Sequence, residues 1–572
     1  WKDSSYPAYV LLQKHSSLAK LQEKIAGTME KHSPGSDALV QLQPLTRVHL
    51  YEFSGGGPIV YIYIFISIGI LIMVIAGINF INLTTARSLN RAKEVGLRKV
   101  IGSSRRQLVN QFMGESILFA SGALVLAIAI VLAILPAVNH SLNKNLQLRP
   151  TTEQVLVFLA IAFGLGIFSG LYPALFLSRI SASDAMRGSF AFGLTRGTLR
   201  KLLVIAQFTV SVFFIFASFV AIRQLSFMKN KDLGFKKDHV ISLQMRGGFA
   251  QNAQAIKSRL LENPNIHSIT AFNGSFTGES NGTSISDWEG RHGQAALGVA
   301  IQAVDENFTR TFNVPVAQGR FFAANRTADA KESVVINQAA AMSLGMKDPV
   351  GKWLQVQVGQ QSGVRKIIGV LKDYHLTTLR RKITPLVMVM APWWYRQVFI
   401  RIAPRDIGTT LTFIQKSIKK IAPDVPWEYA FLDETIDRLY QGEKQMTEIM
   451  TFGTLIALTI TALGLFGLIV FTVGQRTKEI GVRKVMGASA TDILKMLSLD
   501  VLKWIIMACV LAWPLAFYAM NKWLGNFAYR VRIGSGAFLF SVFMLVGLAL
   551  ATMSFQAIRA ARANPVESLR YE

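Results

Sequence analysis

Cysteine is almost absent from this sequence, and its absence excludes a disulfide framework. The single thiol, that of Cys509, lies inside an apolar run, so no paired redox motif can form either. The eight histidines are scattered singly and none belongs to an H-E-x-x-H pattern, so we expect no metal site. The pattern G-x-x-x-x-G-K-[ST] is also missing. The sequence therefore contains no standard loop for binding nucleotide phosphates.

Acidic residues are scarce relative to basic ones. Asp and Glu number 34 against 61 Lys and Arg, while 51% of all residues are hydrophobic and the mean hydropathy is +0.34. A basic patch on a soluble face would indicate nucleic-acid binding, but most basic residues here lie beside long apolar runs. That distribution is typical of a membrane protein with basic cytoplasmic loops. We therefore expect membrane lipid, and no nucleic acid, as a partner.

Seven apolar runs are long enough to cross a bilayer as helices, since a span needs about 20 residues. They lie near residues 58–82, 111–138, 152–178, 201–224, 447–474, 497–520 and 535–558. The sequence therefore predicts an α-helical integral membrane protein with seven spans in this chain.

Lys and Arg concentrate in alternate connections between these runs. Three connections are rich in them: residues 83–110, 179–201 and 475–495. The connection 139–151 has only Lys144 and Arg149. The positive-inside rule then predicts a multi-pass protein with a cytoplasmic C-terminus. The segments 1–57 and 225–446 fall on the opposite side.

The segment 225–446 is predicted to be a large extracytoplasmic α/β domain. Its strand-like runs include 240–244, 333–336, 366–371, 385–390 and 398–402, and its helical stretches include 251–262 and 407–421. Residues 1–57, with an amphipathic segment at 18–29, resemble the end of a similar domain.

Two cytoplasmic segments repeat each other without a gap: RAKEVGLRKVIGSSRRQ at 91–107 and RTKEIGVRKVMGASATD at 476–492. Such a match indicates an internal duplication. We call residues 87–107 the first elbow and residues 476–492 the second elbow. Each is predicted to end one helix and start the next. The signals are a glycine suited to a left-handed C-terminal position, followed by a capping-box pattern: Gly102 with Ser104 and Gln107, and Gly487 with Ser489 and Asp492.

The charges of the elbows admit two interpretations. Glu94 with Arg98, and Glu479 with Arg483, have the i, i+4 spacing of ion pairs on one helix face. Basic residues at a membrane boundary also serve as simple anchors, which is the commoner role of any single Arg. Anchoring does not explain why acid, glycine and apolar positions stay in register in both copies. The repeat therefore favours a shaped surface against which another protein docks.

At these residues the sequence resembles the FtsX/MacB-type family of ABC transporter permeases, in the long Bacteroidetes-like form with two four-helix halves. In that family the KE-hG-hRK-hhGAS segment, where h is apolar, contacts the ATPase. The segments 312–322, 333–352 and 367–385 look like the family's periplasmic core. The resemblance implies an ATPase-coupling role for Arg91, Lys93, Glu94, Gly96, Arg98, Lys99 and Gly102, and for Arg476, Lys478, Glu479, Gly481, Arg483, Lys484 and Gly487.

The resemblance also implies partners and a location. A cytoplasmic ABC ATPase dimer would bind ATP and Mg, so this chain needs no cofactor and is not itself an enzyme. The chain would lie in the bacterial inner membrane with its large domains in the periplasm, and would export or extract a lipoprotein, peptide or amphipathic toxin. A periplasmic adaptor and an outer-membrane component would accompany efflux. The alternative is a signalling protein that activates a cell-envelope hydrolase without transport.

The expected domain organisation follows from the spans and the resemblance. Residues 1–57 are the C-terminal part of a first extracytoplasmic domain, 58–200 the first transmembrane half, 201–224 a span leading outward, 225–446 the second extracytoplasmic domain, and 447–572 the second transmembrane half with a cytoplasmic tail. The family pattern has eight spans, so a first span and most of the first outside domain are expected before Trp1.

Three further features admit structural explanations. Asp373, Tyr374 and His375 resemble an acid–base group, but they are predicted to form a strand exit and turn. The aromatic group 393–395 fits either a partner surface or packing at a hairpin tip. The glycines in the segment 164–170, which include a GxxxG, are expected to pack helices together.

Overall fold

The computed structural model describes most of the chain, namely residues 9–13, 16–28, 31, 40–48, 50–51, 59–88, 92–142, 145–177, 193–274, 276, 281–291, 293, 295–359, 361–475, 479, 482–483, 485–487 and 489–562. These residues form two compact units. Unit 1 takes its residues from Trp1–Val131, Arg149–Leu203 and Leu455–Gly474, and unit 2 from Leu132–Leu148, Val204–Thr454 and Gln475–Glu572.

Six helices are long and apolar enough to cross a membrane within the part of the chain that the structure describes. They are α3 (Ile59–Ser88), α5 (Arg105–Leu142), α8 (Gly193–Asn230), α16 (Gln441–Gln475), α18 (Ala490–Leu524) and α19 (Ser535–Arg562). Each overlaps a predicted span, and most extend past it because polar residues continue the helix beyond its apolar part. The predicted span 152–178 coincides with α6 (Thr152–Leu177), of which the apolar stretch Thr152–Phe168 is shorter than a span.

Glycines of α6 set the packing of helices in unit 1. A Cβ on Gly170 would lie 2.7 Å from the side chain of Ser116 on α5, and one on Gly166 would lie 3.0 Å from the Cα of Ile117. Only glycine lets the two helices approach so closely, which confirms the predicted packing role of this GxxxG. Elsewhere in the unit, Asn79 of α3 donates from Nδ2 to the Ile460 carbonyl of α16 at 3.4 Å.

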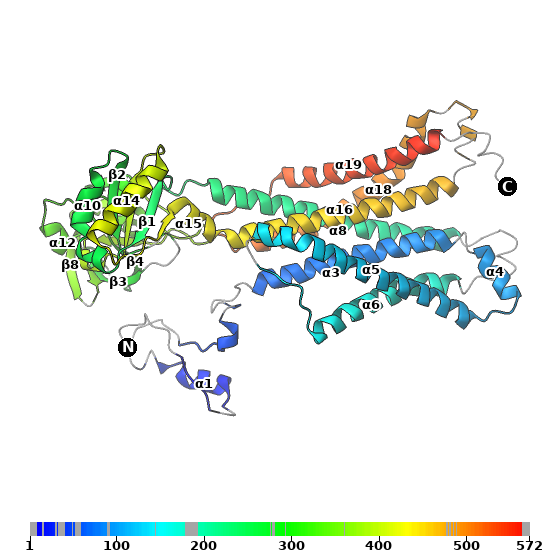
Figure 1. Cartoon of the computed structure of the whole chain (residues 1–572), viewed down its shortest axis with the longest axis horizontal. Helices are drawn as coiled ribbons and strands as arrows, with labels where there is room; N and C mark the ends of the chain where they lie inside the picture. The colour runs from blue at the N-terminus through cyan, green and yellow to red at the C-terminus, as the bar shows by residue number, and fades with distance from the viewer. Residues whose placement is uncertain are drawn as a thin grey trace. The chain divides into compact units, whose positions relative to one another are not determined.

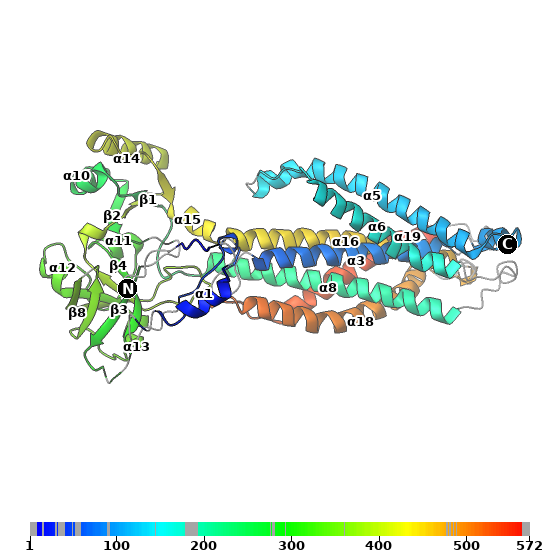
Figure 2. The ribbon, with the colours of Figure 1, turned by 90° about the horizontal axis from the view of Figure 1, so that it is seen from below.

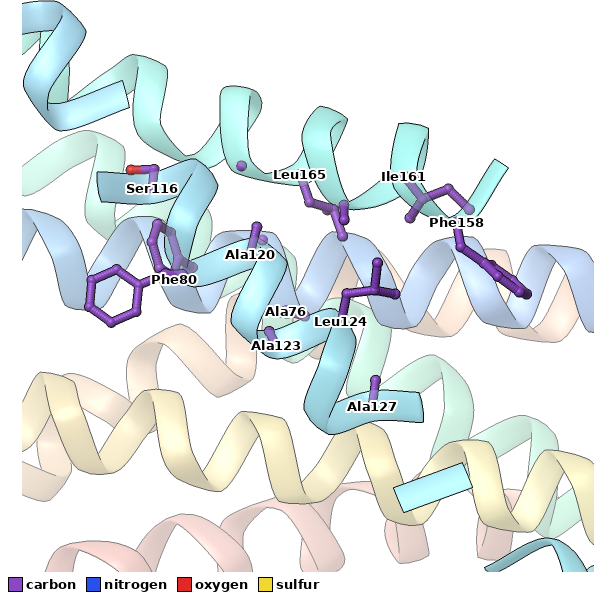
Figure 3. A pocket seen from close by; sticks show the side chains of 14 residues that line it. Ala76, Phe80, Ser116, Ala120, Ala123, Leu124, Ala127, Phe158, Ile161 and Leu165 are labelled. Carbon is purple, nitrogen blue, oxygen red and sulfur yellow. The ribbon is translucent and has the colours of Figure 1, made fainter. Parts of the chain in front are cut away.

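Beyond that crossing, α5 and α6 diverge over α3 and leave an apolar cavity of about 520 Å³ (Figure 3). Phe80, Phe158 and Leu165 are among the side chains that line it. Ser116 also reaches the cavity, but its hydroxyl donates to the Phe112 carbonyl at 2.9 Å. The cavity therefore presents little unsatisfied polarity and suits hydrocarbon better than water.

Unit 2 contains the α/β domain, which has two sheets. The first sheet is antiparallel, with the order β11 (Tyr429–Phe431), β1 (Val240–Gln244), β10 (Gln397–Ile402) and β2 (Ile266–Phe272). The second sheet has the order β5 (Val316–Gly319), β8 (Gln361–Leu371), β6 (Ser333–Asn337), β9 (Leu386–Val389), β4 (Leu297–Ala303), β3 (Asn281–Trp288) and β7 (Trp353–Val358). The second sheet closes on itself because β8 pairs with β7 along residues 361–366 and with β6 along residues 366–371.

Helices α10 (Ala253–Leu261) and α14 (Ile407–Ile421) lie side by side against the first sheet (Figures 1 and 2). Their inward side chains, including Ile256, Leu260 and Ile414, form one core with Ile241 and Ile400 of the sheet. The shorter helices of the domain are α9 (Gly248–Gln251), α11 (Phe308–Phe312), α12 (Ala328–Glu332), α13 (Gln338–Ser343), α15 (Leu432–Leu439) and the 3-10 turn η2 (Pro392–Trp394).

An aromatic cluster joins the two sheets. The stacked rings of Phe272 and Phe399, with centroids 4.7 Å apart, come from the first sheet, and Phe308 and Phe312 of α11 pack edge-on against Phe272. Asp305 is buried beside this cluster. Its carboxylate accepts hydrogen bonds from the side chain of Thr270, from the backbone N–H groups of Ala271 and Asn307, and from the ammonium group of Lys257.

The membrane helices of unit 2 contact one another through both polar and aromatic groups. The hydroxyls of Ser218 on α8 and Thr454 on α16 are 2.7 Å apart. Phe216 of α8 packs edge-on against Phe538 of α19, at a centroid distance of 5.0 Å. The N-terminal part of unit 1 also contains α1 (Leu18–Ile25) and the 3-10 turn η1 (Leu45–Arg47).

Candidate functional site

The first elbow consists of α4 (Ala92–Val100), a tight turn and the start of α5. Gly102 has φ +102°, in the left-handed region. Its N–H bonds the Lys99 carbonyl at 3.1 Å, and the N–H of Ser103 bonds the Arg98 carbonyl at 2.9 Å. This pair of bonds is a Schellman ending, which satisfies carbonyls that the helix leaves free. The predicted helix-ending conformation of Gly102 is confirmed.

The capping box that starts α5 is also present. The Ser104 N–H donates to Gln107 Oε1 at 2.8 Å, and the Gln107 N–H donates to Ser104 Oγ at 3.3 Å. Val95 of α4 is only 2% exposed and packs against Leu108 and Phe112 of α5. The Schellman ending, the capping box and this small core together fix the conformation of the first elbow.

The second elbow repeats this construction where the structure describes it. Gly487 has φ +91°, and Ser489 and Asp492 form the capping box of α18. The two hydrogen bonds from Ser489 lower the pKa of the Asp492 carboxyl, so the box persists at neutral pH. Glu479 and Arg483 form the predicted ion pair, at 2.8 Å.

Several predicted coupling residues fall outside the described part of the chain. These are Arg91, Arg476, Lys478, Gly481 and Lys484. Lys93, Glu94 and Gly96 lie within α4, but only their helical backbone is described. The ion pair between Glu94 and Arg98 thus stays a prediction. Arg98 itself donates from Nη1 to Gln111 Oε1 at 2.7 Å, which ties α4 to α5.

The structure adds a feature that the charge pattern did not identify, an exposed apolar surface on each elbow. We call Leu97, Val100 and Ile101 the first apolar triad; they are 56%, 60% and 77% exposed. The second apolar triad occupies the equivalent positions, and its residues Val482, Val485 and Met486 are 49%, 66% and 81% exposed. The i, i+3, i+4 spacing places each triad on one helix face. That spacing was visible in both copies of the sequence.

Basic groups adjoin the first apolar triad. Lys99 is next to it in the sequence, and partial burial together with the nearby Arg105 charge lowers the Lys99 pKa. An apolar centre with a charged rim is the usual anatomy of a protein–protein interface. The first elbow thus offers a mixed apolar and basic surface that suits a groove with apolar walls and an acidic rim.

The residues 373–375 have structural partners. Tyr374 is buried and donates from its hydroxyl to Gln302 Oε1 at 2.9 Å, and burial raises its pKa well above the ordinary value. Asp373 Oδ1 accepts a hydrogen bond from the Ala339 N–H at 2.9 Å. The ring of His375 contacts the ring of Tyr529 edge-on. These contacts fit the predicted strand exit.

The aromatic group 393–395 contributes mainly to packing. Trp394 and Tyr395 lie against the core of the second sheet, and Tyr395 donates from its hydroxyl to the Val304 carbonyl at 2.9 Å. Trp393 stacks on Trp394 and stays 64% exposed.

These observations define a class of protein: a multi-pass membrane protein with an α/β domain outside the membrane and a duplicated, surface-exposed elbow. The model of the FtsX-like permease C-terminal domain matches residues 66–182 and again 451–565, so it covers both elbows. The model of the MacB-like periplasmic core domain matches residues 202–414. The chain belongs to the FtsX/MacB-type family of ABC transporter permeases, and its α/β domain is a periplasmic core domain.

Curated relatives share modest identity with the chain. The macrolide export ATP-binding/permease protein MacB of Bordetella avium is 24% identical over 298 residues, which are 49% of this chain and 44% of that protein. The uncharacterized ABC transporter permease YknZ of Bacillus subtilis is 22% identical over 299 residues, 49% of this chain and 72% of that protein. The chain thus spans less than half the length of the Bordetella relative.

Among solved structures, the chain is similar to the periplasmic region of MacB from Actinobacillus actinomycetemcomitans. The identity is 13%, the TM-score is 0.26, and the match covers 37% of this chain and 96% of that structure.

Proposed function

We propose that this chain is the permease subunit of an ABC transporter in the bacterial inner membrane, with its C-terminus in the cytoplasm. The carrying observation is the presence of an exposed apolar triad on each of two rigid elbows. Exposed apolar groups at helix ends are disfavoured unless a partner covers them. Two equivalent surfaces in one chain match the two subunits of an ATPase dimer.

In this proposal the ATPase that binds ATP and Mg is a separate polypeptide, and the residues of this chain contain no phosphate-binding loop. In this proposal the two triads and the surrounding elbow residues dock on it. The chain transmits the resulting movement to the periplasmic core domain and carries out no chemistry of its own.

The cargo is proposed to be a lipoprotein, peptide or amphipathic toxin. The cavity between α5 and α6 supports a cargo with an apolar part, since its walls are aromatic and aliphatic. The Bordetella relative is named for macrolide export, which agrees with export or extraction as the process. A periplasmic adaptor and an outer-membrane component would continue the route.

The test is co-purification of the full chain with candidate ATPases, followed by the variants Glu94→Ala and Glu479→Ala. Loss of Glu479 removes the 2.8 Å pair that fixes Arg483, so we expect weaker association and less stimulation of ATP hydrolysis. Glu434→Ala is the matched control, because Glu434 forms an exposed i, i+4 pair with Arg438 in the periplasmic domain. Unchanged association and ATPase activity in both elbow variants would refute the docking role.

A further inference from the structure

The loop between α18 and α19, residues 525–534, is bonded to a loop of the periplasmic core domain. The N–H of Ala528 donates to the Arg380 carbonyl at 3.1 Å, and the N–H of Tyr529 donates to the Leu379 carbonyl at 3.2 Å. Leu379 and Arg380 come shortly after β8, and they precede the loop by about 150 residues in the sequence. Two successive backbone bonds fix both the position and the orientation of the loop.

The Arg380 side chain extends this contact to a second membrane helix. Its Nε donates to Glu443 Oε1 at 2.7 Å, and the Glu443 side chain, at the start of α16, is only 7% exposed. The guanidinium carbon also lies 5.3 Å from the ring centroid of Phe527 in the loop. Arg380 therefore contacts α16 and the loop at the same time. Because the Glu443 carboxylate is so buried, removing its partner Arg380 would leave a charge without compensation and would destabilise the fold.

Gln224 of α8 holds the other side of the same loop. Its Nε2 donates to the Tyr529 carbonyl at 3.0 Å, and its Oε1 accepts from the Val531 N–H at 2.9 Å. Gln224 is 1% exposed, so both ends of its amide are satisfied where water is excluded. We call Gln224, Leu379, Arg380, Glu443 and the loop 525–534 the loop clamp.

The loop clamp links α18 and α19 to the periplasmic core domain within unit 2. The chain enters the periplasmic core domain from α8 and leaves it through α15 into α16, so α18 and α19 have no direct chain connection to the domain. The loop clamp connects them to the domain through non-covalent contacts instead. Since α18 begins directly at the capping box of the second elbow and continues to Leu524, a continuous helix links that elbow to the clamp.

We propose that the loop clamp transmits movement of the second elbow through α18 to the periplasmic core domain, and that Arg380, Glu443 and Gln224 are its positioning residues. The inference rests on the proposed function, because it takes the elbow as the site where ATP-driven movement enters. The clamp makes the domain and the outer ends of α8, α16, α18 and α19 move as one body.

The first experiment tests the clamp without any ATPase. Hydrogen exchange is measured on the full chain in lipid nanodiscs, for the parent and for Glu443→Gln and Gln224→Leu. Glu443→Gln removes the charge from the hydrogen bond with Arg380, and Gln224→Leu removes both hydrogen bonds of the buried Gln224 amide. Because each change weakens the clamp, we expect about tenfold faster exchange of the Ala528 and Tyr529 amides. The control Glu434→Gln makes the same chemical change in an exposed pair and should leave these amides unaffected. Unchanged exchange in both clamp variants would overturn the proposal.

The second experiment tests transmission. Spin labels replace the exposed side chains of Lys419 and Arg532 in a Cys509→Ala background, and their distance is measured in the complex with the ATPase, without nucleotide and with ATP and vanadate. We expect one constant distance in the parent and a nucleotide-dependent distance in Glu443→Gln. A distance that stays equally constant in the variant, or that already changes in the parent, would contradict the clamp. Failure of the ATPase to associate would instead refute the proposed function, while the exchange experiment still decides whether the clamp exists.

Discussion

Met486 offers a direct measure of how much the apolar triads contribute to docking. Its side chain is 81% exposed at the end of the second elbow. Complete burial of a Met side chain stabilises by about 1.5–3 kcal/mol, and the exposed fraction leaves about 1.2–2.4 kcal/mol available to a partner. Met486→Asp removes this contribution and adds a charge that a docked interface would have to desolvate. We therefore expect the affinity for the ATPase to fall by roughly 10- to 50-fold.

The structure supplies a closely matched control. Met342 in the periplasmic core domain is also 81% exposed, so Met342→Asp makes the same change on a surface remote in sequence from either elbow. The assay is titration of the purified ATPase onto the full chain in nanodiscs, with the fraction bound followed by interferometry. Ile101→Asp, at the position equivalent to Met486, should weaken binding by a similar factor. An affinity that drops less than twofold for both elbow variants, or equally for Met342→Asp, would refute the docking role of the triads.

Other expectations concern packing and pH. Gly170→Ala should lower the unfolding temperature measured by intrinsic fluorescence, whereas Gly164→Ala should not, because a Cβ at Gly164 meets nothing within 4 Å. Asp305→Ala leaves the buried donors of Thr270, Ala271 and Asn307 without an acceptor and should cost about 3 kcal/mol, seen as faster hydrogen exchange in β2. Two hydrogen bonds from Arg320 hold the Asp329 pKa below its ordinary value, so the stability they add is present above the ordinary carboxyl pKa and lost as the pH falls through the native one. In thermal unfolding against pH, Asp329→Asn should remove that part of the acid sensitivity.

Local sequence signals predicted much of the fold. The predicted strand 240–244 and helix 407–421 coincide with β1 and α14, and the four predicted strands within 333–402 overlap β6, β8, β9 and β10. These segments carry strong local patterns of β-branched or amphipathic residues. β2, β3, β4, β5, β7 and β11 were not predicted. Several of them are short or partly exposed strands whose pairing depends on distant partners, such as the first half of β8 that closes the second sheet.

The elbows show the same limit at the level of single residues. The repeat identified the turn glycines and capping boxes, because these are short-range devices with fixed residue types. It did not distinguish buried from exposed apolar positions. Val95 and Val100 are five residues apart, which is about 140° around an α-helix, so both cannot face α5. The structure buries Val95 and leaves Val100 60% exposed. Which face packs inward is decided by Leu108 and Phe112, across the turn.

Each half of the chain carries an elbow with an exposed apolar triad, but the connections that follow α5 and α18 make different contacts. In the second half, the connection after α18 joins the loop clamp. In the first half, the connection after α5 is described for residues 145–150, and its Leu146 bonds through both backbone groups to the side chain of Asn139, at 2.8 and 2.9 Å. That contact is local to the end of α5. Under the proposed function, duplication would supply two equivalent docking places for an ATPase dimer, and the route that we propose from such a place to the periplasmic core domain is the loop clamp of the second half.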